Sequence, residues 1–171
     1  MKPHFDFAWG ACLYNEPLKK LIHQFKYGQK TLLRHLFSHL MISFINTYNI
    51  EIQSFDCVVP VPLFSARRRE RGYNQAHLLA QPIAETFHLK LSANNLVRIR
   101  PTKTQAALTQ KERWTNIQGA FKIKQPLTYR NKKILLVDDL LTTGATVSES
   151  ALVLKDAGAT SVGVLTLAIA V

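Results

Sequence analysis

Residues 134–146 read ILLVDDLLTTGAT and constrain the fold of this chain more than any other stretch. The apolar run ILLV is typical of a parallel strand covered on both faces. The following segment, GATVSESALVLKDAG, has the apolar spacing of a helix that ends at Gly158, and SVGVLTLAIA has the composition of a second buried strand. A strand, a helix and a strand in succession predict a right-handed βαβ unit, and hence an α/β fold with a parallel sheet flanked by helices.

The rest of the chain supplies further elements. Apolar residues at helical spacing in EPLKKLIHQFKYG and TLLRHLFSHLMISFINTY predict that the chain opens with two helices. A short buried strand, DCVVPVPL, is cut off by its prolines, and a basic turn, SARRRERGYN, follows it. We then expect a helix over NQAHLLAQPIAETFH that is kinked or restarted at Pro82. The remaining expected elements are a strand at LVRIR, an exposed loop at PTKTQAALTQ, a helix at KERWTNIQ and a strand at AFKIK.

Length and composition predict one domain over residues 1–171, with a small helical hood (1–50) and a core (55–171). The longest apolar-rich segment, HLFSHLMISFINTYNI, is interrupted by polar residues every few positions, so we expect no membrane insertion. The chain has two cysteines, too few for a disulfide framework or a metal cage, and its six histidines lack ligand spacing. These features favour the cytoplasm and argue against a metal held directly by the protein.

The charge of the chain is unevenly distributed. There are 22 basic and 11 acidic residues, a net charge of +11, and residues 1–130 carry 19 of the basic and 7 of the acidic ones. Such a field recruits polyanions, either phosphorylated metabolites or nucleic acid. A second interpretation, that the high charge only aids solubility, stays open.

The turn after the predicted strand indicates a phosphate site. In open α/β sheets, ligands bind beyond the carboxyl ends of the strands, and a helix N-terminus attracts phosphate. Gly144 allows close approach of the backbone, and the hydroxyls of Thr142, Thr143 and Thr146 can donate to phosphate oxygens. The adjacent acids, residues 138–139, would repel a phosphate at contact distance and therefore need a hydrogen-bond donor such as a ribose diol. The pattern predicts a cradle for ribose 5-phosphate.

Other phosphate-binding motifs are absent from the sequence. It has neither the G-x-x-x-x-G-K-[ST] loop nor the G-x-G-x-x-G fingerprint. An ordinary strand–turn–helix with a threonine cap would explain the threonines but not the two acids.

ILLVDDLLTTGAT resembles, position by position, the signature of the type I phosphoribosyltransferases, which bind phosphoribosyl pyrophosphate (PRPP). Three further stretches, LIHQFKYG, VVPVPLFSARRRERGYNQAHLLA and RIRPTKTQAALTQKERWTNIQGAF, resemble the ComF family, which includes ComFC and GntX proteins. The resemblance covers nearly the whole chain. It implies a type I phosphoribosyltransferase fold with a PRPP site that uses Mg²⁺ bound through PRPP. Members of the family usually carry an N-terminal zinc module of paired C-x-x-C motifs; this sequence lacks those motifs, so no zinc is expected.

The resemblance also implies residue roles. Catalytic positions fall at Asp138 and Asp139, which would hold the ribose hydroxyls, and at Lys103 in a mobile flap that could close over the pyrophosphate or remain solvated. The 5′-phosphate would bind to Thr142, Thr143, Gly144, Ala145 and Thr146. The pyrophosphate loop would comprise Val61, Pro62 and Leu63, with Arg67 and Arg71 within reach.

Two further residues have more than one interpretation. Lys26, between two aromatic residues on a core-facing helix, could point into the same cleft. Trp114 fits a core position better than a platform for a base.

Two functions of different classes remain open. One is transfer of phosphoribose from PRPP to a nitrogenous base or amine. The other, implied by the ComF resemblance, is handling of single-stranded DNA during natural transformation, together with the DNA-uptake machinery and with PRPP as substrate or regulator. The residues that would contact DNA are Arg67, Arg68, Arg69, Arg71 and Tyr73. A pure scaffold is disfavoured because the motif is uninterrupted, and an oligomer is compatible with the sequence.

Overall fold

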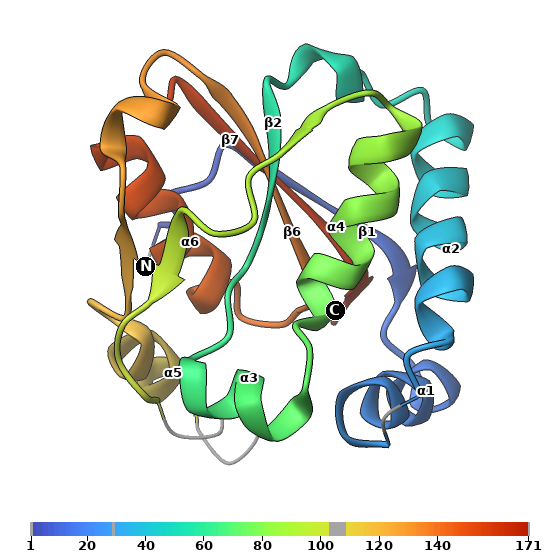
Figure 1. Cartoon of the computed structure of the whole chain (residues 1–171). Coiled ribbons are helices and arrows are strands. Elements are labelled where there is room, and N and C mark those ends of the chain that lie inside the picture. The colour runs from blue at the N-terminus through green and yellow to red at the C-terminus, as the bar shows by residue number, and fades with distance from the viewer. Residues whose placement is uncertain (1, 29, 103–108, 171) are drawn as a thin grey trace.

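The structure, a computed structural model, describes residues 2–28, 30–102 and 109–170. A five-stranded parallel sheet with the order β1-β7-β6-β2-β3 forms its centre, and helices cover both faces (Figure 1). The strands of this sheet are β1 (Phe7–Leu13), β2 (Cys57–Pro60), β3 (Lys90–Leu91), β6 (Lys133–Leu141) and β7 (Ser161–Ile169). The α/β architecture with a parallel sheet, predicted from the sequence, is confirmed.

The helices and a small second sheet complete the fold. The α-helices are α1 (Glu16–Tyr27), α2 (Leu33–Thr47), α3 (Ser65–Arg71), α4 (Gln75–Thr86), α5 (Gln110–Ile117) and α6 (Ala145–Asp156). Among the described residues, 3₁₀ turns lie at η1 (Ile52–Ser54) and η3 (Pro126–Tyr129). Strands β4 (Leu96–Arg98) and β5 (Phe121–Ile123) pair antiparallel. Among the described residues, no helix is both long and apolar enough to cross a membrane.

Each face of the central sheet has its own apolar core. On one face, α1, α2 and α4 pack against sheet residues that include Leu135 and Val137. On the other face, α5, α6 and the β4–β5 pair pack against residues that include Ile134 and Leu136. Figure 1 shows the same division, with α2 and α4 on one side of the sheet and α6 on the other. Consecutive residues of β6 therefore face different helices.

The sequence had suggested a helical segment over the first fifty residues, but the structure shows that this segment also contains a strand. The two expected helices are present as α1 and α2, but β1 precedes them and pairs in parallel with β7. Its sequence, FAWGACL, has no strong alternation, and its partner strand lies about as far away in the chain as possible. Gly10 allows the two strands to approach, because a Cβ there would lie 2.6 Å from the Cβ of Ile169.

Two smaller expectations were also wrong. The basic stretch predicted as a turn folds into α3, because arginine is a good helix former and Gly72, with φ of 80°, provides the left-handed C-cap. Helix α4 does not restart at Pro82 and continues through it to Thr86. Pro82 is half-buried, and the next two residues, Ile83 and Ala84, are packed in the core, which holds the helix together past the proline.

The carboxyl ends of the strands bring three segments to one edge of the sheet. Pro60 pairs with Val137, so the chain leaves β2 at the level where the two aspartates of β6 begin. Strand β1 ends at the same edge and leads into α1, whose N-terminus is capped by Asn15. In Figure 1, α1, α3 and α5 line this edge at the bottom of the view.

Candidate functional site

Two carboxylates lie near the carboxyl end of β6. Because side chains alternate along a strand, Asp138 lies on the face of Leu136, and Asp139 lies on the opposite face with Val137. Asp138 is half-buried, whereas Asp139 is only 6% exposed. Each acid therefore meets a different set of neighbours, although both stand at the edge where a ligand of an α/β sheet binds.

Asp139 forms an ion pair with Lys26 of α1. The distance from Lys26 Nζ to Asp139 Oδ2 is 2.7 Å, and the lysine side chain is 24% exposed. Burial alone would lower the pKa of Lys26, but the charges of Asp139 and Asp138 outweigh it and raise this pKa above its ordinary value. Within the described residues, no well-aligned hydrogen bond reaches the buried Oδ2 atom, so this oxygen retains acceptor capacity. Of the interpretations that the sequence left open for Lys26, the structure shows the one in which its side chain points toward the acids.

The backbone around Lys26 is held on both sides. Phe25 is fully buried, and its carbonyl accepts a hydrogen bond from the hydroxyl of Tyr73. The guanidinium of Arg71 lies 4.9 Å from the centre of the Tyr27 ring. These contacts join the last turn of α1 to α3 and to the start of α4, so the position of the lysine backbone relative to β6 is fixed.

Asp138 has a different environment on the other face. Its Oδ1 accepts a hydrogen bond of 2.9 Å from the backbone N–H of Asp139. Burial, followed by the charge of Asp139, raises the pKa of Asp138 to about 7, against the opposing effects of Lys26 and Arg98. Near neutral pH this carboxyl group can therefore exchange a proton, while Asp139 is the acid with the close counter-ion.

Arg98, at the end of β4, is the cation on the face of Asp138. Burial, and next the neighbouring charge of Arg67, lower the pKa of Arg98 to about 10. Its guanidinium lies over the ring of Phe121 and contacts the hydroxyl of Thr102, while its buried Nε has no hydrogen bond to any residue that the structure describes. A desolvated guanidinium beside a second arginine favours an anion, because an anion would relieve the mutual repulsion.

The turn after β6 leads directly into helix α6. Gly144 adopts φ of 76°, and α6 begins at the next residue, Ala145. The hydroxyl of Thr143 accepts a 3.5 Å hydrogen bond from the backbone N–H of Ala145, and the hydroxyl of Thr142 accepts a 3.3 Å hydrogen bond from Arg113. The first turn of a twelve-residue helix thus opens at the same edge as the acids, with Thr146 half-buried in it.

The segment predicted as the pyrophosphate loop, Val61–Leu63, lies beside the acids. The N–H of Val61 still donates to the carbonyl of Val137 over 2.9 Å, and its own carbonyl accepts a 3.0 Å hydrogen bond from the Asn74 side chain. The two arginines assigned to this loop lie near different cations. Arg71 donates to Gln75 over 2.5 Å, and its charge acts on Lys26. Arg67 donates to the carbonyl of Thr102, and its charge acts on Arg98.

Other predicted residues are not gathered at the acids. Arg68 and Arg69 are exposed on α3. Tyr73 is half-buried, and its ring lies 6.1 Å from that of Phe25 in a tilted arrangement, so in the structure it serves to anchor α1. Trp114 packs against the core beside α6, as expected. Lys103, in the predicted flap, lies outside the described residues.

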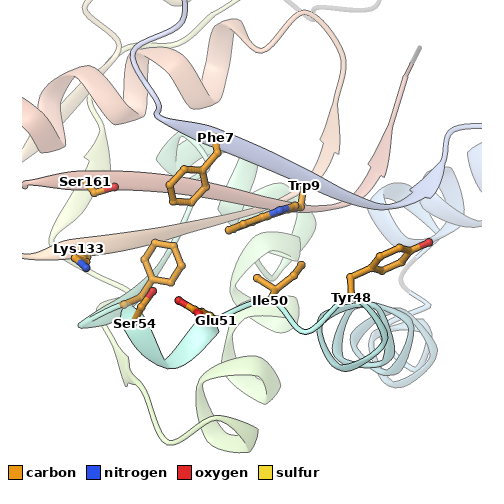
Figure 2. Close-up of a pocket in the computed structure, with 9 residues that line it drawn as sticks. Phe7, Trp9, Tyr48, Ile50, Glu51, Ser54, Lys133 and Ser161 are labelled. Atoms are coloured by element: carbon orange, nitrogen blue, oxygen red, sulfur yellow. The ribbon is translucent and has the colours of Figure 1, made fainter.

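A cavity of about 460 Å³ lies at the opposite end of the sheet (Figure 2). Phe7, Lys133 and Ser161 line it, and they are the first residues of β1, β6 and β7. The rings of Phe7 and Trp9 lie 4.8 Å apart within it. This cavity does not touch the acids, so the candidate site is defined by its charged groups and by the edge of the sheet.

Arg98 and Arg113 are the site residues that the sequence did not reveal as such. From the sequence, Arg98 is an ordinary polar residue of a short predicted strand, and Arg113 is an ordinary polar residue of a predicted helix. Both reach the site only through the packing of β4 and α5 around α6, which no local pattern encodes.

Comparison of the sequence with known proteins identifies the family of this chain. The family described as "Phosphoribosyl transferase domain" matches residues 73–170. The chain is 34% identical over 155 residues to the DNA utilization protein YhgH of Escherichia coli (strain K12), covering 88% of this chain and 66% of that protein. It is 32% identical over 162 residues to Competence protein F of Haemophilus influenzae, covering 91% of this chain and 69% of that protein. The chain thus spans about two thirds of the length of the curated relatives that it matches.

The sheet, the acids at its edge and the family match together define a type I phosphoribosyltransferase fold. Within that class, the chain belongs to the ComF family. Among solved structures, glutamine PRPP amidotransferase from B. subtilis is similar at 18% identity with a TM-score of 0.47, over 83% of this chain and 26% of that chain. A likeness at that level adds nothing to the assignment.

Proposed function

We propose that the chain binds PRPP, with Mg²⁺, at the carboxyl edge of the central sheet. Asp138 and Asp139 would accept hydrogen bonds from the two ribose hydroxyls, and the turn 142–146 would hold the 5′-phosphate. The observation that carries the proposal is the buried Oδ2 of Asp139, which among the described residues has an ion pair but no well-aligned hydrogen bond and lies at the same edge of the sheet as the N-terminus of α6. A sugar hydroxyl supplies the donor that this oxygen lacks.

The charges on the two sides of the acids suit the pyrophosphate group. Lys26 and Arg71 lie on one side, and Arg98 and Arg67 lie on the other. The described residues contain no group of three or more His, Cys, Asp or Glu side chains that could hold a metal ion, so Mg²⁺ would come bound to oxygens of PRPP. There it would neutralise part of the pyrophosphate charge and make pyrophosphate a better leaving group.

The reaction that this arrangement supports is transfer of phosphoribose to a nitrogen nucleophile. The bond from ribose C1 to the pyrophosphate oxygen breaks, and pyrophosphate keeps the electron pair. A bond from nitrogen to C1 forms, and the nucleophile loses a proton. Positive charge develops on the ring and negative charge on pyrophosphate, and the ionised Asp139 and the surrounding cations have the signs that stabilise this separation.

Titration calorimetry with PRPP and Mg²⁺ tests binding, and a pyrophosphate-release assay with a panel of nucleobases and amines tests turnover. We expect saturable binding to one site. Absence of heat at millimolar PRPP would contradict the proposal. Binding without pyrophosphate release would leave PRPP as a regulatory ligand.

We further propose that the chain handles single-stranded DNA in the cytoplasm during natural transformation. Its relatives are named for DNA utilization and competence, and residues 1–130 carry most of the positive charge. The exposed Arg68 and Arg69 lie on α3, the helix that also carries Arg67 and Arg71, and can reach a phosphate backbone. Electrostatic binding of this kind weakens by orders of magnitude between about 50 and 200 mM salt.

A fluorescent oligonucleotide titrated at several salt concentrations tests this role. The double variant Arg68→Gln/Arg69→Gln should reduce the salt dependence of binding relative to the wild type. Lys19→Gln/Lys20→Gln, which removes two exposed lysines of α1, is the matched control. If the wild-type protein shows no salt-sensitive binding, the function is that of a metabolic phosphoribosyltransferase without a DNA role.

A further inference from the structure

The ion pair between Lys26 and Asp139 occupies an atom that the proposed ligand needs. Asp139 Oδ2 lies 2.7 Å from Lys26 Nζ, and it is the oxygen assigned to a ribose hydroxyl in the proposed function, on which this inference rests. Among the described residues the ammonium contacts this oxygen without a well-aligned hydrogen bond, so a hydroxyl that binds there enters the space next to the ammonium and must share the oxygen with it or displace it. Binding of the sugar alone therefore weakens an existing contact of a buried acid.

The ammonium group of Lys26 can move away from Asp139. Its backbone is fixed by the contacts of Phe25 and Tyr27, but its four-carbon side chain can rotate, and it is partly exposed. The guanidinium of Arg71, over the ring of Tyr27 and bonded to Gln75, is close enough for its charge to lower the pKa of Lys26, so two cations lie near each other at this end of α1. Such a pair is unfavourable by itself and becomes favourable when a multiply charged anion lies between its members.

We propose that Lys26 exchanges partners when PRPP binds, and that this exchange selects sugar phosphates that carry a pyrophosphate. Lys26 Nζ leaves Asp139 Oδ2 to a ribose hydroxyl and pairs, together with Arg71, with the pyrophosphate. Ribose 5-phosphate displaces the same ammonium without offering it a new anion. PRPP compensates for the lost ion pair, and ribose 5-phosphate does not.

The quantity that measures this role is the ratio of the affinities for PRPP and for ribose 5-phosphate. In Lys26→Met the pyrophosphate loses a charge-assisted contact, so PRPP binds more weakly, while ribose 5-phosphate no longer has an ion pair to displace. The ratio should fall by about tenfold or more, the equivalent of one charge-assisted hydrogen bond. Both ligands bind the same folded molecules, so a partial loss of folded protein cancels in the ratio.

Titration calorimetry of both ligands, with Mg²⁺ present throughout, is the experiment. Lys26→Arg restores the charge and should return the ratio toward the wild-type value. Lys20→Met, an exposed lysine on the same helix, should leave the ratio unchanged. A Lys26→Met variant in which both affinities fall by the same factor overturns the exchange, because it shows a structural role alone. A wild-type protein that binds neither ligand overturns the proposed function itself.

Discussion

Replacement of Asp139 by asparagine removes one charge from the site and preserves the shape of the side chain. In the wild-type protein the carboxylate is 6% exposed, and its Oδ2 lies 2.7 Å from Lys26 Nζ. A hydrogen bond from a sugar hydroxyl to such an ionised, desolvated oxygen contributes about 1.5–3 kcal/mol. Asp139→Asn should therefore weaken PRPP binding by about 10- to 150-fold.

The same substitution has a smaller effect on stability. It leaves Lys26 without its counter-ion, but the lysine side chain is 24% exposed and can turn toward water. The loss should fall well below the roughly 3–5 kcal/mol that removal of one partner from a fully buried pair costs. The variant should thus remain folded under conditions in which PRPP binding is measured.

Titration calorimetry at pH 8, with a saturating and constant Mg²⁺ concentration, is the assay. Asp156→Asn is the matched control, since it removes one negative charge from an exposed position at the far end of α6. The control should bind PRPP like the wild type. If Asp139→Asn also bound PRPP with wild-type affinity, Asp139 would not hold the ribose, and the assignment of the acids would be wrong.

Three further predictions concern stability, measured by urea unfolding. The pKa of Asp138, about 7 against an ordinary 3.8, means that the folded state binds the proton more tightly, so Asp138 costs stability progressively as the pH rises from about 4 to 7. Asp138→Asn should therefore gain stability relative to the wild type between pH 5 and pH 8, and an equal difference at both values would contradict the raised pKa. Gly10→Ala should lose about 1–3 kcal/mol because its Cβ would overlap the side chain of Ile169; no loss would show that β1 does not pair as described. Tyr73→Phe removes the hydrogen bond to α1 and should cost about 0.5–1.5 kcal/mol, and an unchanged unfolding midpoint would count against that anchor.

The part of the fold that the sequence predicted is the part whose signal is local. The unit β6–α6–β7 has two continuous apolar runs around a helix with its own glycine stop, so each element is specified by adjacent residues. The acids and the small-residue turn follow the strand directly, and their place at the carboxyl edge follows from the parallel sheet alone. Whether they bind PRPP is a prediction that the fold does not test.

The rest depends on contacts between distant segments. Strand β1 has a weak pattern of its own and is stabilised by pairing with the last strand of the chain. Arg98 becomes a site residue only because β4, which pairs with β5 and packs in the same core as α6, holds it near Asp138, and Arg113 only because α5 packs beside α6. Lys26 was an intermediate case, since its place between two aromatic residues on a core-facing helix left open that it could point into the cleft, but not which acid it would meet.

A crystal structure of the protein with PRPP and Mg²⁺ tests the central claim most directly. We expect the ribose hydroxyls within hydrogen-bonding distance of Asp138 and Asp139, the 5′-phosphate on the turn 142–146, and Lys26 Nζ turned toward the pyrophosphate. PRPP bound in another place, such as the aromatic cavity at the opposite end of the sheet, would contradict the account, and so would an empty turn at saturating PRPP.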